Sequence, residues 1–242
     1  MVSGLYRLPL ALTSWYVGHK ASRPPRPPAT PEERSAYESS KDTRDLMSYI
    51  IWWYVPAMLV LIYTIIVGEV FFDTMTWATS LRNLFPFTES LCPSSALQEI
   101  RVTSPFLVGC FLTTAGAILR LLCYRELGRQ FTFELSSRKD DKLITTGPYS
   151  YVRHPSYTGA FVYLIGFPLW LVTSGSWFAE CGMWQTTAGK VYVITLIAML
   201  AFFLSSIARR VVKEDKVLRD TYGAQWEAWA KKTPYKVLPG IY

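Results

Sequence analysis

The sequence predicts an all-α protein, a polytopic transmembrane helical bundle of four to five spans. Half of the 242 residues are hydrophobic and only 18% are charged, whereas a soluble domain needs more charge to cover its surface. Aromatic side chains make up 15% of the chain and include nine Trp, as is typical of the belts that border a bilayer. Long apolar runs alternate with basic segments, which completes the pattern of a multi-pass membrane protein.

The N-terminal region, residues 1–47, predicts an apolar segment followed by a proline-rich linker. Leu5–Val17 is apolar but shorter than the ~20 residues of a membrane span, and it contains Pro9. A tilted first span, an interfacial helix and a signal-anchor all fit this run. Ser22–Thr30 holds Arg-Pro-Pro-Arg-Pro-Pro, typical of a polyproline linker. We expect a transmembrane domain to occupy residues 48–242.

Four further apolar runs predict membrane-spanning helices within this domain. They are Tyr49–Val67, Pro105–Leu122, Tyr157–Val172 and Lys190–Ile207.

The distribution of Lys and Arg predicts the orientation of these spans. Basic residues concentrate in Lys20–Arg44, in Arg125–Arg153 and in the C-terminal tail, whereas Gly68–Ser104 and Thr173–Gly189 hold few. Cytosolic loops carry the excess of positive charge. The basic central loop and the tail are therefore expected on the cytosolic side, where they can build one site together.

The central loop ends in an unusual stretch, Gly147–Gly159, which reads Gly-Pro-Tyr-Ser-Tyr-Val-Arg-His-Pro-Ser-Tyr-Thr-Gly. Pro148 and Pro155 each disfavour helix in the residue before them, so the chain is expected to break twice. An apolar helix should begin directly afterwards, with the partial positive charge of its N-terminus at the membrane surface. This arrangement indicates a ligand site at the mouth of a membrane helix.

The second half of the predicted site follows the last span. Arg210 and Glu214 are four residues apart, so a continuing helix places them on one face. A surface ion pair is the ordinary alternative for such a pair. His154 is either a core histidine or a ligand contact. Interfacial tyrosine is the better interpretation of Tyr151, whereas Tyr149 and Tyr157 fit an interfacial and a binding role equally.

Several other chemistries are excluded by the sequence. The four cysteines form no Cys-x-x-Cys pair, and two histidines are too few for a His-rich metal site. No Ser-His-Asp order, phosphate-binding glycine loop or paired-carboxylate signature is present. The formal net charge of +7 fits an anionic membrane surface better than nucleic acid, because it accompanies apolar runs. We therefore expect no metal and no nucleic-acid partner.

Three motifs together resemble the membrane-embedded isoprenylcysteine carboxyl methyltransferases and the related phospholipid methyltransferases. The motifs are Leu127–Thr132, Lys142–Tyr149 and Arg153–Gly159. The tail is similar to the first family through Arg210, Glu214-Asp215, Leu218, Tyr222-Gly223, Trp226, Trp229 and Thr233-Pro234. The resemblance covers roughly the last half of the chain.

This resemblance implies an S-adenosylmethionine-dependent enzyme that methylates the C-terminal carboxylate of a prenylated protein or of a small prenylcysteine. It implies an endoplasmic reticulum membrane protein whose site faces the cytosol, within 134–159 and 209–229. Arg210 and Glu214 would be catalytic, with Arg210 on the substrate carboxylate. The cofactor contacts it implies are Glu134, Asp141, Lys142, Leu143, Ile144, Tyr149, His154, Pro155, Ser156, Tyr157 and Glu214.

Two departures and three rivals accompany the resemblance. The family usually has His where Asp141 stands and an amide where Glu134 stands. A phospholipid N-methyltransferase acting on phosphatidylethanolamine is the nearest rival. An NADPH-dependent sterol reductase is the second, although that family usually has an acidic residue where Ala160 follows Gly159. A membrane scaffold without activity is the third.

Overall fold

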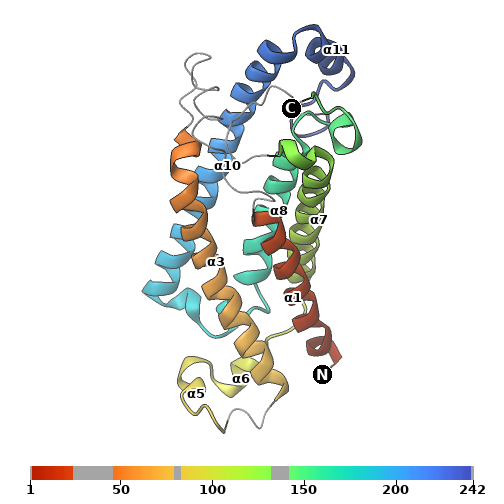
Figure 1. Cartoon of the computed structure of the whole chain (residues 1–242). Coiled ribbons are helices and arrows are strands. Elements are labelled where there is room, and N and C mark those ends of the chain that lie inside the picture. The colour runs from red at the N-terminus through yellow and green to blue at the C-terminus, as the bar shows by residue number, and fades with distance from the viewer. Residues whose placement is uncertain (1, 24–45, 79–82, 132–141, 241–242) are drawn as a thin grey trace. The chain divides into compact units, whose positions relative to one another are not determined.

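The computed structural model describes residues 2–23, 46–78, 83–131 and 142–240, and every regular element within these ranges is helical (Figure 1). The long helices are α1 (Val2–Ser22), α3 (Leu46–Trp77), α7 (Ser104–Leu127), α8 (Pro155–Leu171) and α10 (Thr187–Tyr222). The shorter ones are α5 (Thr88–Leu91), α6 (Ser94–Leu97), η1 (Gly128–Gln130), η2 (Gly147–Ser150), α9 (Trp177–Glu180), η3 (Met183–Gln185) and α11 (Ala224–Lys232). Most of the linker predicted at Ser22–Thr30 lies outside the described residues, and the division at residue 47 stays a prediction.

The predicted all-α transmembrane bundle is confirmed. Among the described residues, Trp53–Thr76, Ser104–Leu127 and Thr187–Tyr222 are long and apolar enough to cross a membrane. α8 has 17 residues and α1 has 21, and both lengths fall within the 17–25 residues typical of spans. Counting either or both gives the four to five spans that the sequence predicts.

α3 continues well beyond the predicted end of its span at Val67 and reaches Trp77. Gly68 does not end the helix. Its missing side chain leaves space for the indole ring of Trp177, because a Cβ on Gly68 would lie 2.6 Å from that ring. The two carboxylates beyond it, Glu69 and Asp73, are paired with Arg7. Their charge is therefore compensated, and the helix accommodates them.

The chain forms two compact units. Unit 1 comprises Met1–His19, Pro56–Ala115 and Val162–Ala201, and unit 2 comprises Lys20–Val55, Gly116–Phe161 and Phe202–Tyr242. In unit 1, α7 and α8 approach each other closely at Gly109. A Cβ on this glycine would lie only 2.7 Å from the backbone nitrogen of Trp170. Such a close approach of two backbones is the usual role of small residues between membrane helices.

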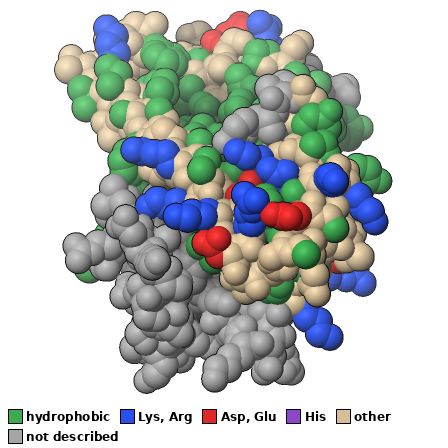
Figure 2. All heavy atoms as spheres, turned by 90° about the horizontal axis from the view of Figure 1, so that it is seen from above, with side chains coloured by type: hydrophobic (Ala, Val, Ile, Leu, Met, Phe, Trp, Pro, Cys, Tyr) green, Lys and Arg blue, Asp and Glu red, His purple; other side chains and the backbone are tan. Residues whose placement is uncertain are grey.

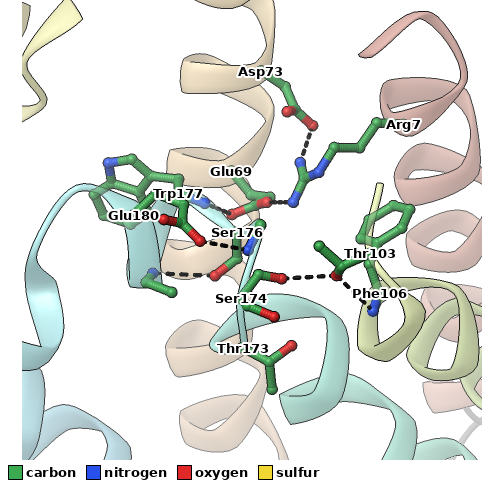
Figure 3. Close-up of polar contacts among 12 residues, drawn as sticks. Arg7, Glu69, Asp73, Thr103, Phe106, Thr173, Ser174, Ser176, Trp177 and Glu180 are labelled. Atoms are coloured by element: carbon green, nitrogen blue, oxygen red, sulfur yellow. Dashed lines mark hydrogen bonds and ion pairs between the residues drawn. The ribbon is translucent and has the colours of Figure 1, made fainter. Parts of the chain in front are cut away.

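Unit 1 contains a buried charge cluster that joins α1 to α3. The guanidinium of Arg7 donates hydrogen bonds to Glu69 and Asp73, and all three residues are at most 3% exposed (Figure 3). The second carboxylate oxygen of Glu69 accepts the Trp177 backbone N–H at 3.0 Å, and the Phe106 ring lies 4.6 Å from the Arg7 guanidinium carbon. The cluster thereby also fixes the start of α9.

Replacing Arg7 with glutamine should destabilise the protein more than replacing Asp73 with asparagine. The first change leaves two carboxylates buried together, whereas the second leaves a one-to-one pair of Arg7 with Glu69. Breaking a buried pair costs about 3–5 kcal/mol. Thermal unfolding in detergent should place Arg7→Gln lowest, Asp73→Asn between it and the wild type, and equal midpoints would contradict this role.

A disulfide joins Cys92, which precedes α7 in the sequence, to Cys181, which follows α9. The two cysteines are 89 residues apart. Cys92 packs in a small core with Phe72, Leu97 and Ile100. The scattered cysteine spacing gave no signal for this bond. Cys110 and Cys123 are not part of a disulfide, and both are buried.

Candidate functional site

The loop before α8 breaks twice, as its two prolines predict. η2 begins at Gly147, whose φ of 56° favours glycine, and α8 begins at Pro155. The carbonyl of His154 accepts the first helical N–H bonds, from Tyr157 at 3.0 Å and from Thr158 at 3.2 Å. His154 is thereby held at the start of α8, and its side chain is buried.

The last long helix continues past the predicted span end at Ile207 to Tyr222. Arg210 and Glu214 therefore lie one helical turn apart, as their spacing predicts. Arg210 is 5% exposed, which excludes the ordinary surface ion pair. Glu214 Oε2 lies 3.7 Å from His154 Nδ1, so the two predicted halves of the site meet in unit 2.

Asp215 holds the loop and α10 together. Its carboxylate accepts hydrogen bonds from Arg153 Nε at 3.2 Å and from the Arg153 terminal nitrogen at 2.9 Å. The Nε2 atom of His154 lies 2.9 Å from Asp215 Oδ1. A carboxylate can only accept, so this imidazole nitrogen carries a proton. The other ring nitrogen of His154, Nδ1, lies on the side of Glu214.

Glu214 differs from its neighbour in one respect that bears on ligand binding. Its Oε2 atom is buried and has no hydrogen-bond partner within the described part of the chain. Buried carboxylate oxygens are normally bonded, so an orphan of this kind needs an explanation. A cationic ligand between Glu214 and the loop would supply the missing partner.

The backbone of the C-terminal segment 233–237 is hydrogen-bonded to the loop that carries His154 and to the first turn of α8. Arg153 donates to the carbonyls of Thr233 and Pro234, at 3.0 and 2.9 Å. The next three carbonyls accept the backbone N–H of Arg153, the backbone N–H of His154 and the hydroxyl of Thr158. The tail thus fixes the position of the loop that carries His154.

Tyr149 forms the apolar wall of the site together with Cys123 and Trp229, while Leu143 and Ile144 pack against the same cluster. Tyr149 is 7% exposed, and its carbonyl accepts the Trp229 indole N–H at 3.1 Å. Burial raises the pKa of Tyr149, so its phenol stays neutral at physiological pH.

The remaining predicted residues have different surroundings. Pro155 and Ser156 form the buried first turn of α8, and the Tyr157 ring stacks on His154 at 5.8 Å. Lys142 is exposed, and its backbone is bonded on both sides to the Gln130 amide. Glu134 and Asp141 lie outside the described residues. Tyr151 is 75% exposed, in agreement with an interfacial role.

Two functional neighbours have only a weak signal in the sequence. Asp215 belongs to an acidic pair, but nothing in its spacing indicates that it pairs with Arg153, 62 residues away. Trp226 lies between Arg153 and Arg219, with guanidinium carbons 5.6 and 5.9 Å from its ring centre. Such cation–π contacts extend the network that starts at Asp215.

Basic side chains gather around this end of unit 2. Figure 2 views the end that carries α11 and shows many Lys and Arg side chains with few carboxylates. The exposed basic residues here include Lys142, Arg209, Lys216, Arg219, Lys231 and Lys232.

Residues 107–220 match the profile of the isoprenylcysteine carboxyl methyltransferase (ICMT) family. A probable protein-S-isoprenylcysteine O-methyltransferase from Oryza sativa subsp. indica is 30% identical over 136 residues, which cover 55% of this chain and 61% of that protein. The protein-S-isoprenylcysteine O-methyltransferase of Schizosaccharomyces pombe is 30% identical over 121 residues, which cover 49% of this chain and 43% of that protein. The matched region thus covers less than two thirds of the length of either relative.

The chain is also similar to a second kind of protein, but the aligned region covers a smaller share of that protein's length. The Delta(14)-sterol reductase of Candida albicans is 30% identical over 108 residues, which cover 45% of this chain and 20% of that protein. The family profile places its own match at residues 107–220.

Proposed function

Because residues 107–220 match the isoprenylcysteine carboxyl methyltransferase family, we propose that this protein transfers a methyl group from S-adenosylmethionine to the C-terminal carboxylate of a prenylated cysteine. The observation that carries the proposal is the buried Glu214 Oε2 atom, which has no hydrogen-bond partner among the described residues and lies 3.7 Å from His154. Arg210 stands one turn before it on α10.

The residues present fit a cationic cofactor. An orphaned carboxylate oxygen suits the positive charge of a sulfonium or an ammonium group, and aromatic faces such as Tyr157 favour the same charge. The residues that would hold the cofactor are Lys142, Leu143, Ile144, Tyr149, His154, Pro155, Ser156, Tyr157 and Glu214, with Glu134 and Asp141 added by family resemblance. When bound, S-adenosylmethionine supplies a methyl group attached to positively charged sulfur.

The chain's own residues then orient the second substrate. A carboxylate is already ionised at neutral pH, so no general base is required. Arg210 would bind this carboxylate through two parallel N–H donors. Holding both reactants in line and excluding water lowers the barrier without covalent participation of the protein. The apolar prenyl chain would enter from the bilayer and the polar cofactor from the aqueous side.

The sterol reductase similarity favours a second candidate, NADPH-dependent reduction of a sterol. Ala160, which replaces the acidic residue usual in that family, is 1% exposed. The orphaned carboxylate of Glu214 also disfavours a cofactor that carries several phosphates. Phospholipid N-methylation stays the nearest alternative, because it would use the same methyl donor.

One experiment separates these functions. Membranes that contain the protein are incubated with methyl-labelled S-adenosylmethionine and either an S-farnesylcysteine analogue or phosphatidylethanolamine. We expect base-labile label on the farnesylcysteine analogue alone. Label on the phospholipid would establish the N-methyltransferase, and failure to bind S-adenosylmethionine saturably would overturn both methyl-transfer functions.

Replacing Arg210 with lysine should lower kcat/KM for the farnesylcysteine analogue about 10- to 100-fold, while the affinity for S-adenosylmethionine stays within about threefold. Lysine keeps the charge but lacks the planar pair of donors that fits a carboxylate. Arg209→Lys is the matched control, since this neighbour on α10 is exposed. Equal kinetics of the two variants would argue against the substrate role of Arg210.

The protein is a multi-pass membrane protein, and we propose that it resides in the endoplasmic reticulum with the site facing the cytosol. Cys92 precedes α7 and the site loop follows this helix, so an α7 that crosses the bilayer would place them on opposite sides of it. Disulfides persist in oxidising compartments such as the lumen of the endoplasmic reticulum. The Cys92–Cys181 bond therefore supports the orientation that the basic residues predict.

This orientation predicts how the disulfide responds to reductants in sealed microsomes. A membrane-impermeant phosphine should leave the Cys92–Cys181 bond intact, whereas the same phosphine added to permeabilised microsomes should open it. Two additional maleimide–polyethylene glycol tags on the denatured protein report opening. Reduction in sealed, right-side-out vesicles would place this bond on the cytosolic side and reverse the proposed topology.

A further inference from the structure

Arg120 occupies a buried position in unit 2 where three helices meet. It lies on α7, is 7% exposed, and donates to three oxygens. Its Nε bonds the Ala21 carbonyl at 3.2 Å, and its terminal nitrogens bond the Ser156 carbonyl at 3.1 Å and the Tyr124 hydroxyl at 2.7 Å. One guanidinium therefore touches both α1 and the first turn of α8.

The contact with α1 satisfies a specific need of that helix. Ala21 is one residue from the end of α1, so its carbonyl has no partner within the helix. The Tyr124 hydroxyl donates to the same carbonyl at 2.5 Å. A cation near a helix C-terminus also opposes the negative end of the helix dipole. Arg120 and Tyr124 together cap α1.

The contact with α8 explains the glycine that ends the Arg153–Gly159 motif. A Cβ on Gly159 would lie 2.8 Å from Arg120 Cγ and 2.6 Å from the Gly116 carbonyl. Both separations are too short for a real side chain. Gly159 thus provides the space in which the Arg120 side chain passes beside α8 to reach Ser156.

We propose that Arg120 is a positioning residue, which ties the C-terminal end of α1 to the first turn of α8 and so makes α1 part of the support of the site. Ser156 stands two residues after His154, within the turn that His154 begins. A shift of the Ser156 carbonyl would move the loop that faces Glu214. α1 lies outside residues 107–220 that match the family, so this link adds a segment that the family pattern does not include.

Hydrogen exchange tests the link without any ligand. The purified full-length protein is compared as wild type, Arg120→Gln and Tyr124→Phe, with Arg125→Gln as the matched control because Arg125 is exposed on the same helix. In Arg120→Gln we expect faster amide exchange both near residue 21 and near residues 154–158. Tyr124→Phe should affect the α1 end alone. Unchanged exchange at either segment in Arg120→Gln would overturn the proposal.

Kinetics then tests the consequence for the site and rests on the proposed function. The KM for S-adenosylmethionine should rise about tenfold in Arg120→Gln, as expected when a hydrogen bond from a charged group is lost. The kcat and the KM for the farnesylcysteine analogue should change by less than about threefold, and Arg120→Lys should recover part of the loss. A lower kcat with unchanged KM would indicate only a smaller folded fraction and would overturn the positioning role. Because exchange is measured without substrates, it decides the link even if the wild type methylates nothing.

Discussion

Replacing Glu214 with glutamine should weaken binding of S-adenosylmethionine about 10- to 100-fold and reduce methyl transfer at least as much. The substitution keeps the shape of the side chain but removes the charge from an oxygen that is buried and lacks a hydrogen-bond partner in the described part of the chain. A hydrogen bond to a charged group contributes about 1.5–3 kcal/mol, which corresponds to this range at 1.4 kcal/mol per tenfold. Equilibrium binding of labelled cofactor to purified protein measures the change directly.

The matched control is Glu227→Gln, which removes a charge from α11 in the same unit. Glu227 pairs with Arg219 at 2.8 Å, and its side chain is 57% exposed. We expect its cofactor affinity and unfolding midpoint to equal those of the wild type. Wild-type affinity in Glu214→Gln itself would remove the observation on which the proposed function depends.

Replacing Asp215 with asparagine should instead lower the stability of the protein, by about 3–5 kcal/mol. That is the typical loss when one member of a buried ion pair is removed and its partner stays behind. Here the change would leave both Arg153 and His154 without their carboxylate. The midpoint of thermal unfolding in detergent should fall clearly below that of Glu214→Gln.

Asp220→Asn provides the comparison for this second variant, because Asp220 is exposed on the same helix. Its unfolding midpoint should match the wild type within error. An Asp215→Asn protein of wild-type stability would show that the three-residue network does not hold the loop to α10. The contacts would then no longer indicate different roles for the two adjacent carboxylates, ligand binding for Glu214 and stabilisation of the fold for Asp215.

The helices could be predicted from the sequence more reliably than their ends. Apolar runs located α7, α8 and α10 because an uninterrupted run of this length has few alternatives to a membrane helix. Their ends were misjudged where a helix continues beyond the apolar run, as α10 does to Tyr222. Hydropathy reports the bilayer, whereas the length of a helix also depends on the residues that extend it into water.

The site could be predicted only in part. Helical spacing placed Arg210 and Glu214 on one helix, and the two prolines predicted the broken loop at His154. The contacts of Asp215 with Arg153, and of Arg120 with Ala21, join residues 62 and 99 positions apart. Local pattern carries no information about such pairs. The disulfide across 89 residues was missed for the same reason.

The row of carbonyls at 233–237 has a consequence for how this region tolerates change. All five acceptors belong to the backbone, so most side chains there can be exchanged without loss of a bond to Arg153, His154 or Thr158. Adding or removing a single residue would shift every acceptor out of register at once. Homologous sequences should therefore conserve the length of this segment more strictly than its composition.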